Sequence, residues 1–192
     1  MSIQLSHAAG AEHTDQALSN SVGTRWPEEI FATLKALDVR QVTYVPDAGH
    51  SRLIDLCIAE STMTTVSLTT EEEGVALLAG AWLGGQRGVL LMQSSGVGNC
   101  INMLAMTRTC RFPLLCIVTM RGQWGEFNPW QVPMGQTTEE VLKLSGVMVY
   151  PVADASALEE TVAAAGRIVF NGPAAAAVLI SQRIIGTKTF GK

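Results

Sequence analysis

The sequence is poor in charged and aromatic residues, which make up only 16% and 6% of its 192 positions. With 47% hydrophobic residues, the chain is too apolar to be intrinsically disordered. Its 13 Lys and Arg side chains are outnumbered by 17 Asp and Glu, a balance that argues against nucleic-acid binding. So few charges also favour a surface that another chain partly covers, because solvated surfaces are usually richer in charge.

Disulfide, metal-binding and membrane patterns are missing as well. No two cysteines form a C-x-x-C pair, and we expect buried thiols at all four positions, Cys57, Cys100, Cys110 and Cys116. The three histidines do not cluster, so no metal site is expected on this chain. The first 24 residues contain no apolar run, and the uncharged stretch 88–107 is too polar for a membrane span. Together these absences predict a cytoplasmic protein.

Apolar segments of strand length alternate with segments of helical periodicity along most of the chain. We expect strands at 42–45, 64–68, 88–92, 114–119, 147–150 and 175–180. Helices are expected from residue 26 and at 51–59, 71–83, 98–109, 138–144 and 156–169, with a long loop at 121–136. This alternation predicts a three-layer α/β/α domain with a mostly parallel sheet. The domain is expected to occupy residues 25–185, between a flexible lead-in at 1–24 and a tail at 186–192.

Ligands of such a sheet gather at the carboxyl ends of its strands. One segment there, Ser94-Ser95-Gly96-Val97-Gly98-Asn99, follows an expected strand and opens an expected helix. Its backbone amides suit an anion or a heterocycle, whereas the plain alternative is a tight turn. The segment lacks both the third glycine of a dinucleotide fingerprint and the lysine of a phosphate-binding loop.

The segment Glu71-Glu72-Glu73 begins another helix directly after a strand. Acidic residues there complement the helix dipole, which accounts for at least two of the three. The helix behind them is unusually apolar, so the first carboxylate is expected to lie at a strand end in apolar surroundings. Because burial disfavours the charged form of a carboxylate, such a group can act as a proton donor or relay.

Three segments together resemble the pyrimidine-binding domain of thiamine-diphosphate-dependent 2-oxoacid decarboxylases, most closely the sulfopyruvate and phosphonopyruvate branch. They are Val45-Pro46-Asp47, Glu71 nine residues before Gly80 in an Ala- and Gly-rich helix, and the run from Met92 to Asn99. The likeness covers about residues 26–180, in the same order of elements. It implies a carboxy-lyase in which the cofactor carries the bond cleavage and the protein supplies position and a proton relay.

The resemblance also implies roles for individual residues. It assigns to Glu71 the glutamate that binds N1′ of the aminopyrimidine ring. The implied cofactor contacts are Pro46, Glu71, Ser95, Gly96, Gly98 and Asn99. For the substrate we expect contacts from Asp47, His50, Gln93 and Arg121, with the arginine suited to a sulfonate or phosphonate group. Thr70 and Ala48 stand where the family often has His or Asn and Ser, so no role is transferred to those two side chains.

A second domain is implied by what this sequence does not contain. The family holds the cofactor diphosphate through Mg²⁺ bound to a Gly-Asp-Gly segment, and no such segment occurs in these 192 residues. The resemblance therefore implies half of an active site, with a beta chain supplying the diphosphate and magnesium half. The expected assembly is a hetero-oligomer with at least two copies of each chain, active only when complete.

Two other interpretations stay open at this point. A stand-alone Rossmann-like or flavodoxin-like nucleotide-binding domain explains the sheet and the glycines, but not the carboxylate in an apolar setting. A non-catalytic subunit that retains the fold explains the sheet as well, although it gives no reason for keeping Glu71.

Overall fold

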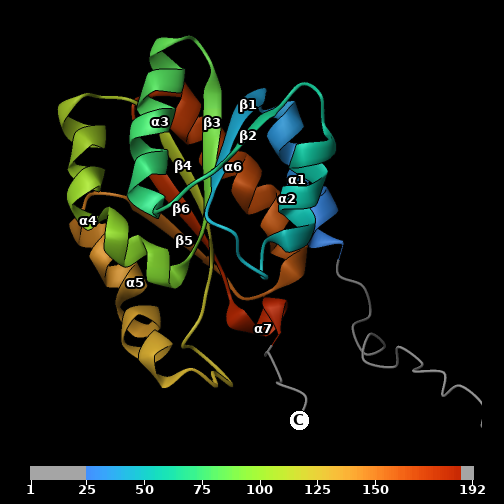
Figure 1. The fold of residues 1–192 in the computed structure, drawn as a ribbon, viewed down its shortest axis with the longest axis vertical. Coiled ribbons are helices and arrows are strands. Elements are labelled where there is room, and N and C mark those ends of the chain that lie inside the picture. The colour runs from blue at the N-terminus through green and yellow to red at the C-terminus, as the bar shows by residue number, and fades with distance from the viewer. Residues whose placement is uncertain (1–24, 187–192) are drawn as a thin grey trace, which may run out of the picture.

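The computed structural model describes residues 25–186 as one parallel α/β domain (Figure 1). Its sheet contains six strands in the order β2-β1-β3-β4-β6-β5, with every neighbouring pair parallel. The strands are β1 Val39–Tyr44, β2 Thr64–Ser67, β3 Arg87–Gln93, β4 Leu114–Thr119, β5 Met148–Val152 and β6 Ala175–Ile180. The predicted fold class is confirmed. The predicted lead-in at 1–24 and the tail from 187 lie outside the described residues.

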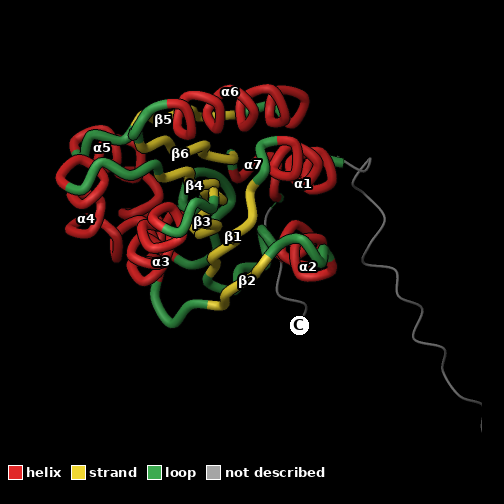
Figure 2. The backbone as a smooth tube through the Cα atoms, turned by 90° about the horizontal axis from the view of Figure 1, so that it is seen from above, coloured by secondary structure: helices red, strands yellow, loops and turns green. Residues whose placement is uncertain are grey.

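Helices cover both faces of the sheet, which makes the molecule three layers thick (Figure 2). One face carries α3 Glu71–Leu83, α4 Ser94–Thr109 and α5 Val132–Leu144. The opposite face carries α1 Trp26–Ala36, α2 Ser51–Ala59 and α6 Leu158–Asn171. Short elements complete the described chain: the 3₁₀ turns η1 Pro129–Gln131 and η2 Ala155–Ala157, and the final helix α7 Gln182–Ile185.

The core consists of two apolar layers separated by the sheet. Strands β4 and β6 are buried along their whole length, as their unbroken apolar sequences predict for strands covered on both faces. On one side Ile30 and Leu34 of α1 pack towards the sheet, and on the other Val75 and Leu78 of α3 do so. This rigid frame fixes where each strand ends, and therefore where the loops that follow can lie.

Two predicted helix starts are wrong, and glycine explains both. The predicted turn at 94–97 is the first turn of α4, and the predicted loop at 121–136 already contains η1 and the first turns of α5. Gly96 and Gly98 have ordinary negative φ. The helical Gly135 lies so close to the carbonyl of Arg121 that a Cβ would sit 1.8 Å from its oxygen. These glycines permit close approach within helices instead of breaking them.

Smaller corrections concern the last third of the chain and one thiol. Strand β5 continues through Pro151, which is permitted because β5 lies at the edge of the sheet. Helix α6 begins at Leu158, after the turn η2, and not at residue 156. Three of the four cysteines are buried as predicted, but Cys110 is exposed, because it caps the carboxyl end of α4 before the chain turns into β4.

Candidate active site at the carboxyl edge of the sheet

The carboxyl ends of β1, β3 and β4 meet at one edge of the sheet. Strands β1 and β3 are neighbours, yet the helices that follow them, α2 and α4, lie on opposite faces (Figure 2). Connections that leave adjacent parallel strands in opposite directions open a crevice between them, where ligands of such sheets bind. The segments that the sequence analysis selected after these strands come together at this edge.

Asp47 is the centre of a hydrogen-bond network that joins the three strand ends. Its Oδ2 accepts from the Thr119 hydroxyl at 2.7 Å and from the backbone N–H of Gly49 at 3.2 Å. Its Oδ1 accepts from the Gln93 amide at 2.9 Å, and the Gln93 oxygen accepts from the Ser95 hydroxyl at 2.8 Å. Asp47 and Gln93, both predicted as substrate contacts, are therefore adjacent, and Ser95 belongs to their network.

A small cleft of about 20 Å³ lies beside this network. Its lining consists of Asp47, Gly49, Thr119, Arg121, Ile185 and Gly186. Thr119 is not among the predicted site residues, because it stands at the end of an otherwise apolar strand. Its position as the last residue of β4 is the signal that marks it, since side chains at strand ends face this edge.

Glu71 begins α3 and is only 7% exposed. Its Oε2 accepts a hydrogen bond from the side-chain amide of Asn99 on α4, at 2.8 Å. The rest of the carboxylate lies against Gly96, where a Cβ would fall 2.3 Å from Oε1. Gly96 and Asn99 are three positions apart on α4 and so face the same neighbour. The predicted buried carboxylate at a strand end is thus present, and two of the predicted cofactor residues contact it.

His50 lies deeper than the sequence analysis expected of a substrate contact, because its side chain is fully buried. Its Nε2 is 3.3 Å from the carbonyl oxygen of Met92 and 3.2 Å from that of Ile117, so it bridges the ends of β3 and β4. Burial lowers the pKa of His50 below its usual range, while Asp47 and the two carbonyl contacts oppose that change. The imidazole is therefore neutral at neutral pH. Its contacts hold β3 and β4 together near their carboxyl ends.

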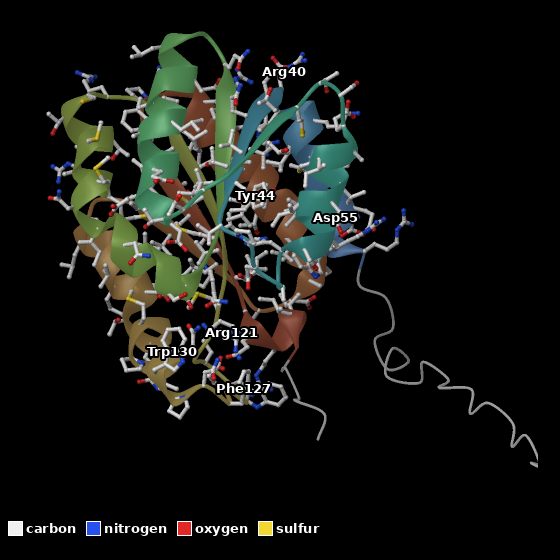
Figure 3. All side chains as sticks on the ribbon, in the orientation of Figure 1. Arg40, Tyr44, Asp55, Arg121, Phe127 and Trp130 are labelled. Carbon is white, nitrogen blue, oxygen red and sulfur yellow. The ribbon has the colours of Figure 1, made fainter. Side chains whose placement is uncertain are left out.

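Arg121 reaches the same edge but is already engaged by an acidic residue. Its Nε and Nη2 donate to the two carboxylate oxygens of Glu126 at 2.7 and 2.5 Å, and the side chains are 9% and 3% exposed. Its guanidinium also lies 5.7 Å from the centre of the Phe127 ring, in the loop at the lower end of Figure 3. Two of the three guanidinium nitrogens are thus committed to this loop.

Glu126 and Gln182 organise that loop, and the sequence analysis identified neither. Besides Arg121, Glu126 accepts from the N–H groups of Gly122 and Asn128 and from the Gln182 amide. The oxygen of Gln182 in turn accepts from the N–H groups of Gln123 and Trp124. Burial raises the pKa of Glu126, but its bonds to Arg121, Asn128 and Gly122 outweigh this and lower it to about 2.

The two remaining predicted cofactor contacts, Pro46 and Gly98, have no polar side chain. Pro46 is exposed just beyond β1, and Gly98 lies on α4, where a Cβ would come 3.2 Å from the sulfur of Met134. Within residues 25–186, no three His, Cys, Asp or Glu side chains converge as a metal site would require. Nor does any helix in that range have the length and apolar character to cross a membrane.

The buried carboxylate suits an aminopyrimidine ring. A ring nitrogen that must hold a proton needs an acid partner shielded from water, and Glu71 is buried at the edge of the sheet with Asn99 beside its opening. In the described chain, Asn99 makes the only hydrogen bond to this carboxylate, so Oε1 retains its capacity to accept or carry a proton. Glu71 with its two neighbours on α4 therefore fits the pyrimidine half of thiamine diphosphate.

Comparison with solved structures supports this architecture. The chain resembles 2-oxoglutarate:ferredoxin oxidoreductase from Magnetococcus marinus with a TM-score of 0.66, over 83% of this chain and 29% of that one. Because only 13% of the aligned residues are identical, this likeness speaks for the fold alone.

Sequence comparison gives nearer relatives. The sulfopyruvate decarboxylase subunit alpha of Methanocaldococcus jannaschii is 34% identical over 122 residues, which is 63% of this chain and 72% of that subunit. The phosphonopyruvate decarboxylase of Streptomyces viridochromogenes is 36% identical over 118 residues, covering 60% of this chain and 30% of that enzyme. Residues 25–139 match the family model described as thiamine pyrophosphate enzyme, N-terminal TPP binding domain. The predicted resemblance is confirmed, and this chain belongs to the thiamine pyrophosphate enzymes, whose N-terminal TPP binding domain it contains.

Proposed function

We propose that this chain is the alpha subunit of a thiamine-diphosphate-dependent 2-oxo acid decarboxylase of the sulfopyruvate or phosphonopyruvate type. The observation that carries the proposal is the buried carboxylate of Glu71, held by Asn99 at the carboxyl edge of the sheet. The names of the relatives support the substrate class, and the family supports the cofactor. A cytoplasmic location belongs to the proposal.

The role proposed for Glu71 is to hold and release a proton at N1′ of the pyrimidine ring. When bound, thiamine diphosphate supplies the thiazolium carbon that attacks the ketone and accepts the electrons left by departing carbon dioxide. Gly96 leaves the room in which the carboxyl lies, and Asn99 orients it. The packing of α3 and α4 excludes water from the carboxyl, which strengthens its interaction with the ring.

The diphosphate half is assigned to a partner. We propose that a beta chain with a Gly-Asp-Gly segment binds Mg²⁺ and the cofactor diphosphate, and that at least two copies of each chain assemble. The name "subunit alpha" of several relatives supports this division. The few charged residues of the chain fit a surface that is partly covered in the assembly.

The proposal is tested by reconstitution. Co-expression with a candidate beta chain should give a complex that releases carbon dioxide from a 2-oxo acid when thiamine diphosphate and Mg²⁺ are present. In that complex Glu71→Gln should lower turnover by about two to four orders of magnitude, the usual worth of an acid–base group. Glu72→Gln and Glu73→Gln are the matched controls, because both neighbours are exposed. Equal losses at all three positions, or no loss at Glu71, refute the assignment.

A further inference from the structure

The contact between Asn99 and Glu71 has a property that a contact from a charged residue lacks. An asparagine side chain carries a donor and an acceptor on one planar group, whereas lysine and arginine only donate and an ionised carboxylate only accepts. The final torsion of asparagine is broad and nearly two-fold, so a half-turn exchanges its oxygen and nitrogen at little cost. A carboxyl group that gains and loses a proton therefore finds a suitable partner in either state.

We propose that Asn99 is a two-way positioning residue for Glu71. In the structure its amide nitrogen donates to Oε2, which is the arrangement that suits an ionised Glu71. When Glu71 carries a proton, the amide turns and its oxygen accepts from the new O–H group. Asn99 thus holds the carboxyl in one place through both states and exchanges no proton itself. The inference rests on the proton-relay role given to Glu71 in the proposed function.

The surroundings of the pair leave room for this rotation. Asn99 lies on the exposed side of α4, while the carboxylate of Glu71 lies against Gly96. Gly96 offers neither a donor nor an acceptor side chain, so it favours neither protonation state. The amide can turn towards solvent because only one of its atoms has a protein partner in the described chain.

Other ionisable groups near Glu71 do not take over this role. Glu72 and Glu73 lie in the same helical turn but are exposed, and Glu73 accepts from the backbone N–H of Thr69. From α4 the neighbouring group is Cys100. Burial, followed by the charges of Glu71 and Glu72, raises the pKa of that thiol to about 12, so it is neutral at neutral pH.

The strands packed against α3 contribute no competing charge beside the carboxylate. Arg40 of β1 and Arg87 of β3 stand at the amino ends of their strands, at the opposite edge of the sheet. Tyr44 packs on the other face of the sheet. Cys116 of β4 is fully buried, and burial raises its pKa far above the usual range.

The proposal is tested on this chain alone by NMR, without cofactor or partner. The pH is lowered while the side-chain amide resonances of Asn99 and the carboxyl carbon of Glu71 are followed. Both should move with one midpoint, and Glu71→Gln should abolish the movement of Asn99. Glu72→Gln should leave it in place, and the amide of the exposed Asn102, on the same helix, serves as the internal control. An Asn99 amide that ignores the protonation of Glu71 overturns the proposal.

Substitution then separates a two-way partner from a simple donor. Asn99→Ala removes both interactions, so the Glu71 midpoint should move by less than about 0.3 pH unit. A simple donor stabilises only the ionised form, and its loss should raise the midpoint by about 0.4–1 pH unit. Asn99→Asp should raise it clearly, because a second carboxylate disfavours ionisation. Asn102→Ala is the matched control variant.

The outcomes remain distinct from those of the proposed function. A rise of the midpoint in Asn99→Ala overturns the two-way role even if the assembled enzyme decarboxylates a 2-oxo acid. The assembled enzyme could instead prove inactive. The pairing of Asn99 with Glu71 is still supported if both groups titrate with one midpoint and Asn99→Ala leaves the Glu71 midpoint unchanged. Alanine has a higher helix propensity than asparagine, so the variant is expected to keep α4 folded. The wild-type titration tests the pairing even if the Asn99→Ala variant does not fold, because it needs no substitution at position 99.

Discussion

Glu71 occupies the space in which any other residue at position 96 would place its Cβ. A Cβ built on Gly96 falls 2.3 Å from Oε1, 2.4 Å from Cδ and 2.5 Å from Cγ of Glu71, all closer than real Cβ atoms approach. The glycine is therefore required by the carboxylate and not by the backbone, since the φ of Gly96 is not positive. A substitution at position 96 should therefore disturb the Glu71 carboxylate more than it disturbs the stability of the fold.

Gly96→Ala should leave the fold intact and impair the site. The three nearest atoms that a Cβ would meet all belong to the Glu71 side chain and none to the backbone, so this side chain can shift to another rotamer. Alanine also favours a helix over glycine by about 0.5–1 kcal/mol, which offsets part of the strain. Circular dichroism should show a melting temperature near that of wild type, while turnover of the assembled enzyme falls by about two orders of magnitude.

The matched control is Gly80→Ala on α3, where a Cβ meets nothing within 4 Å. That variant should keep wild-type turnover and gain slightly in stability. If Gly96→Ala is as active as Gly80→Ala, the carboxylate does not depend on this space.

The loop after β4 should lose stability in acid, because its anchor is a carboxylate. The pKa of Glu126 is lowered to about 2 from the ordinary value of 4.5. A lowered pKa means that the ionised form is favoured by folding. The contribution is thus fully present above about pH 4.5 and disappears as the pH falls towards about 2. Denaturant unfolding at a series of pH values should show this slope in wild type and a flatter one in Glu126→Gln.

At neutral pH, Glu126→Gln should lower the free energy of unfolding by about 3 kcal/mol, because it leaves a buried guanidinium without its counter-charge. Glu139→Gln is the control, since the pair of Glu139 with Lys143 is exposed and worth at most about 1 kcal/mol. Similar losses in the two variants would show that burial does not strengthen the Arg121–Glu126 pair.

Thiamine diphosphate should bind this chain weakly or not at all in the absence of a partner. In residues 25–186 no cluster of acidic side chains is arranged to hold the Mg²⁺ that bridges to a diphosphate, and the role proposed for Glu71 concerns the pyrimidine ring alone. Isothermal titration calorimetry should detect strong, magnesium-dependent heat only after the beta chain is added. Tight binding of cofactor and magnesium to the isolated chain contradicts the proposed division of the site.

Arg121 should matter most for substrates with a second anionic group. Glu126 already engages Nε and Nη2, which leaves Nη1 to meet a sulfonate or phosphonate beside the small cleft. Arg121→Ala should lower kcat/KM for sulfopyruvate and phosphonopyruvate relative to pyruvate by about 10–150-fold, the worth of a charged hydrogen bond. Comparison with pyruvate cancels any general loosening of the loop.

The exposed aromatic rings of the same loop suggest an alternative to a substrate with a second anionic group. Trp124, Phe127 and Trp130 are 48%, 36% and 68% exposed and suit either a partner surface or an aromatic substrate. Phenylpyruvate therefore belongs in the panel. A preference for it, together with indifference to Arg121→Ala, overturns the anionic substrate class while leaving decarboxylation in place.

The sequence predicts the fold well where local pattern and tertiary packing agree. Helix α3 and strands β4 and β6 have the predicted bounds, because their apolar patterns coincide with the faces that the core covers. The starts of α4 and α5 could not be predicted in this way. Gly96 and Gly135 look like turn residues in isolation, and only the neighbours they admit, Glu71 and the Arg121 carbonyl, explain them.

The same distinction holds for the candidate site, where some residues could be predicted from the sequence and others could not. A resemblance carried by three short segments leads to Glu71 and assigns Asn99 to the cofactor, but it cannot state that the two side chains are hydrogen-bonded. Glu126 stands in a loop without periodicity, and its partner Gln182 follows 56 residues later. Contacts across such distances depend on the strand order, which the one-dimensional pattern does not contain.

The strand order also fixes the sequence of events by which this edge is completed. Strand β6 lies between β4 and β5, although it comes last in the chain among the strands of residues 25–186. Gln182, directly beyond it, secures Gln123 and Trp124 across 59 and 58 residues. The loop that bears Arg121 is therefore synthesised long before the residue that shapes it. On a growing chain, this loop reaches its final form only after β6 has joined the sheet and brought Gln182 into place.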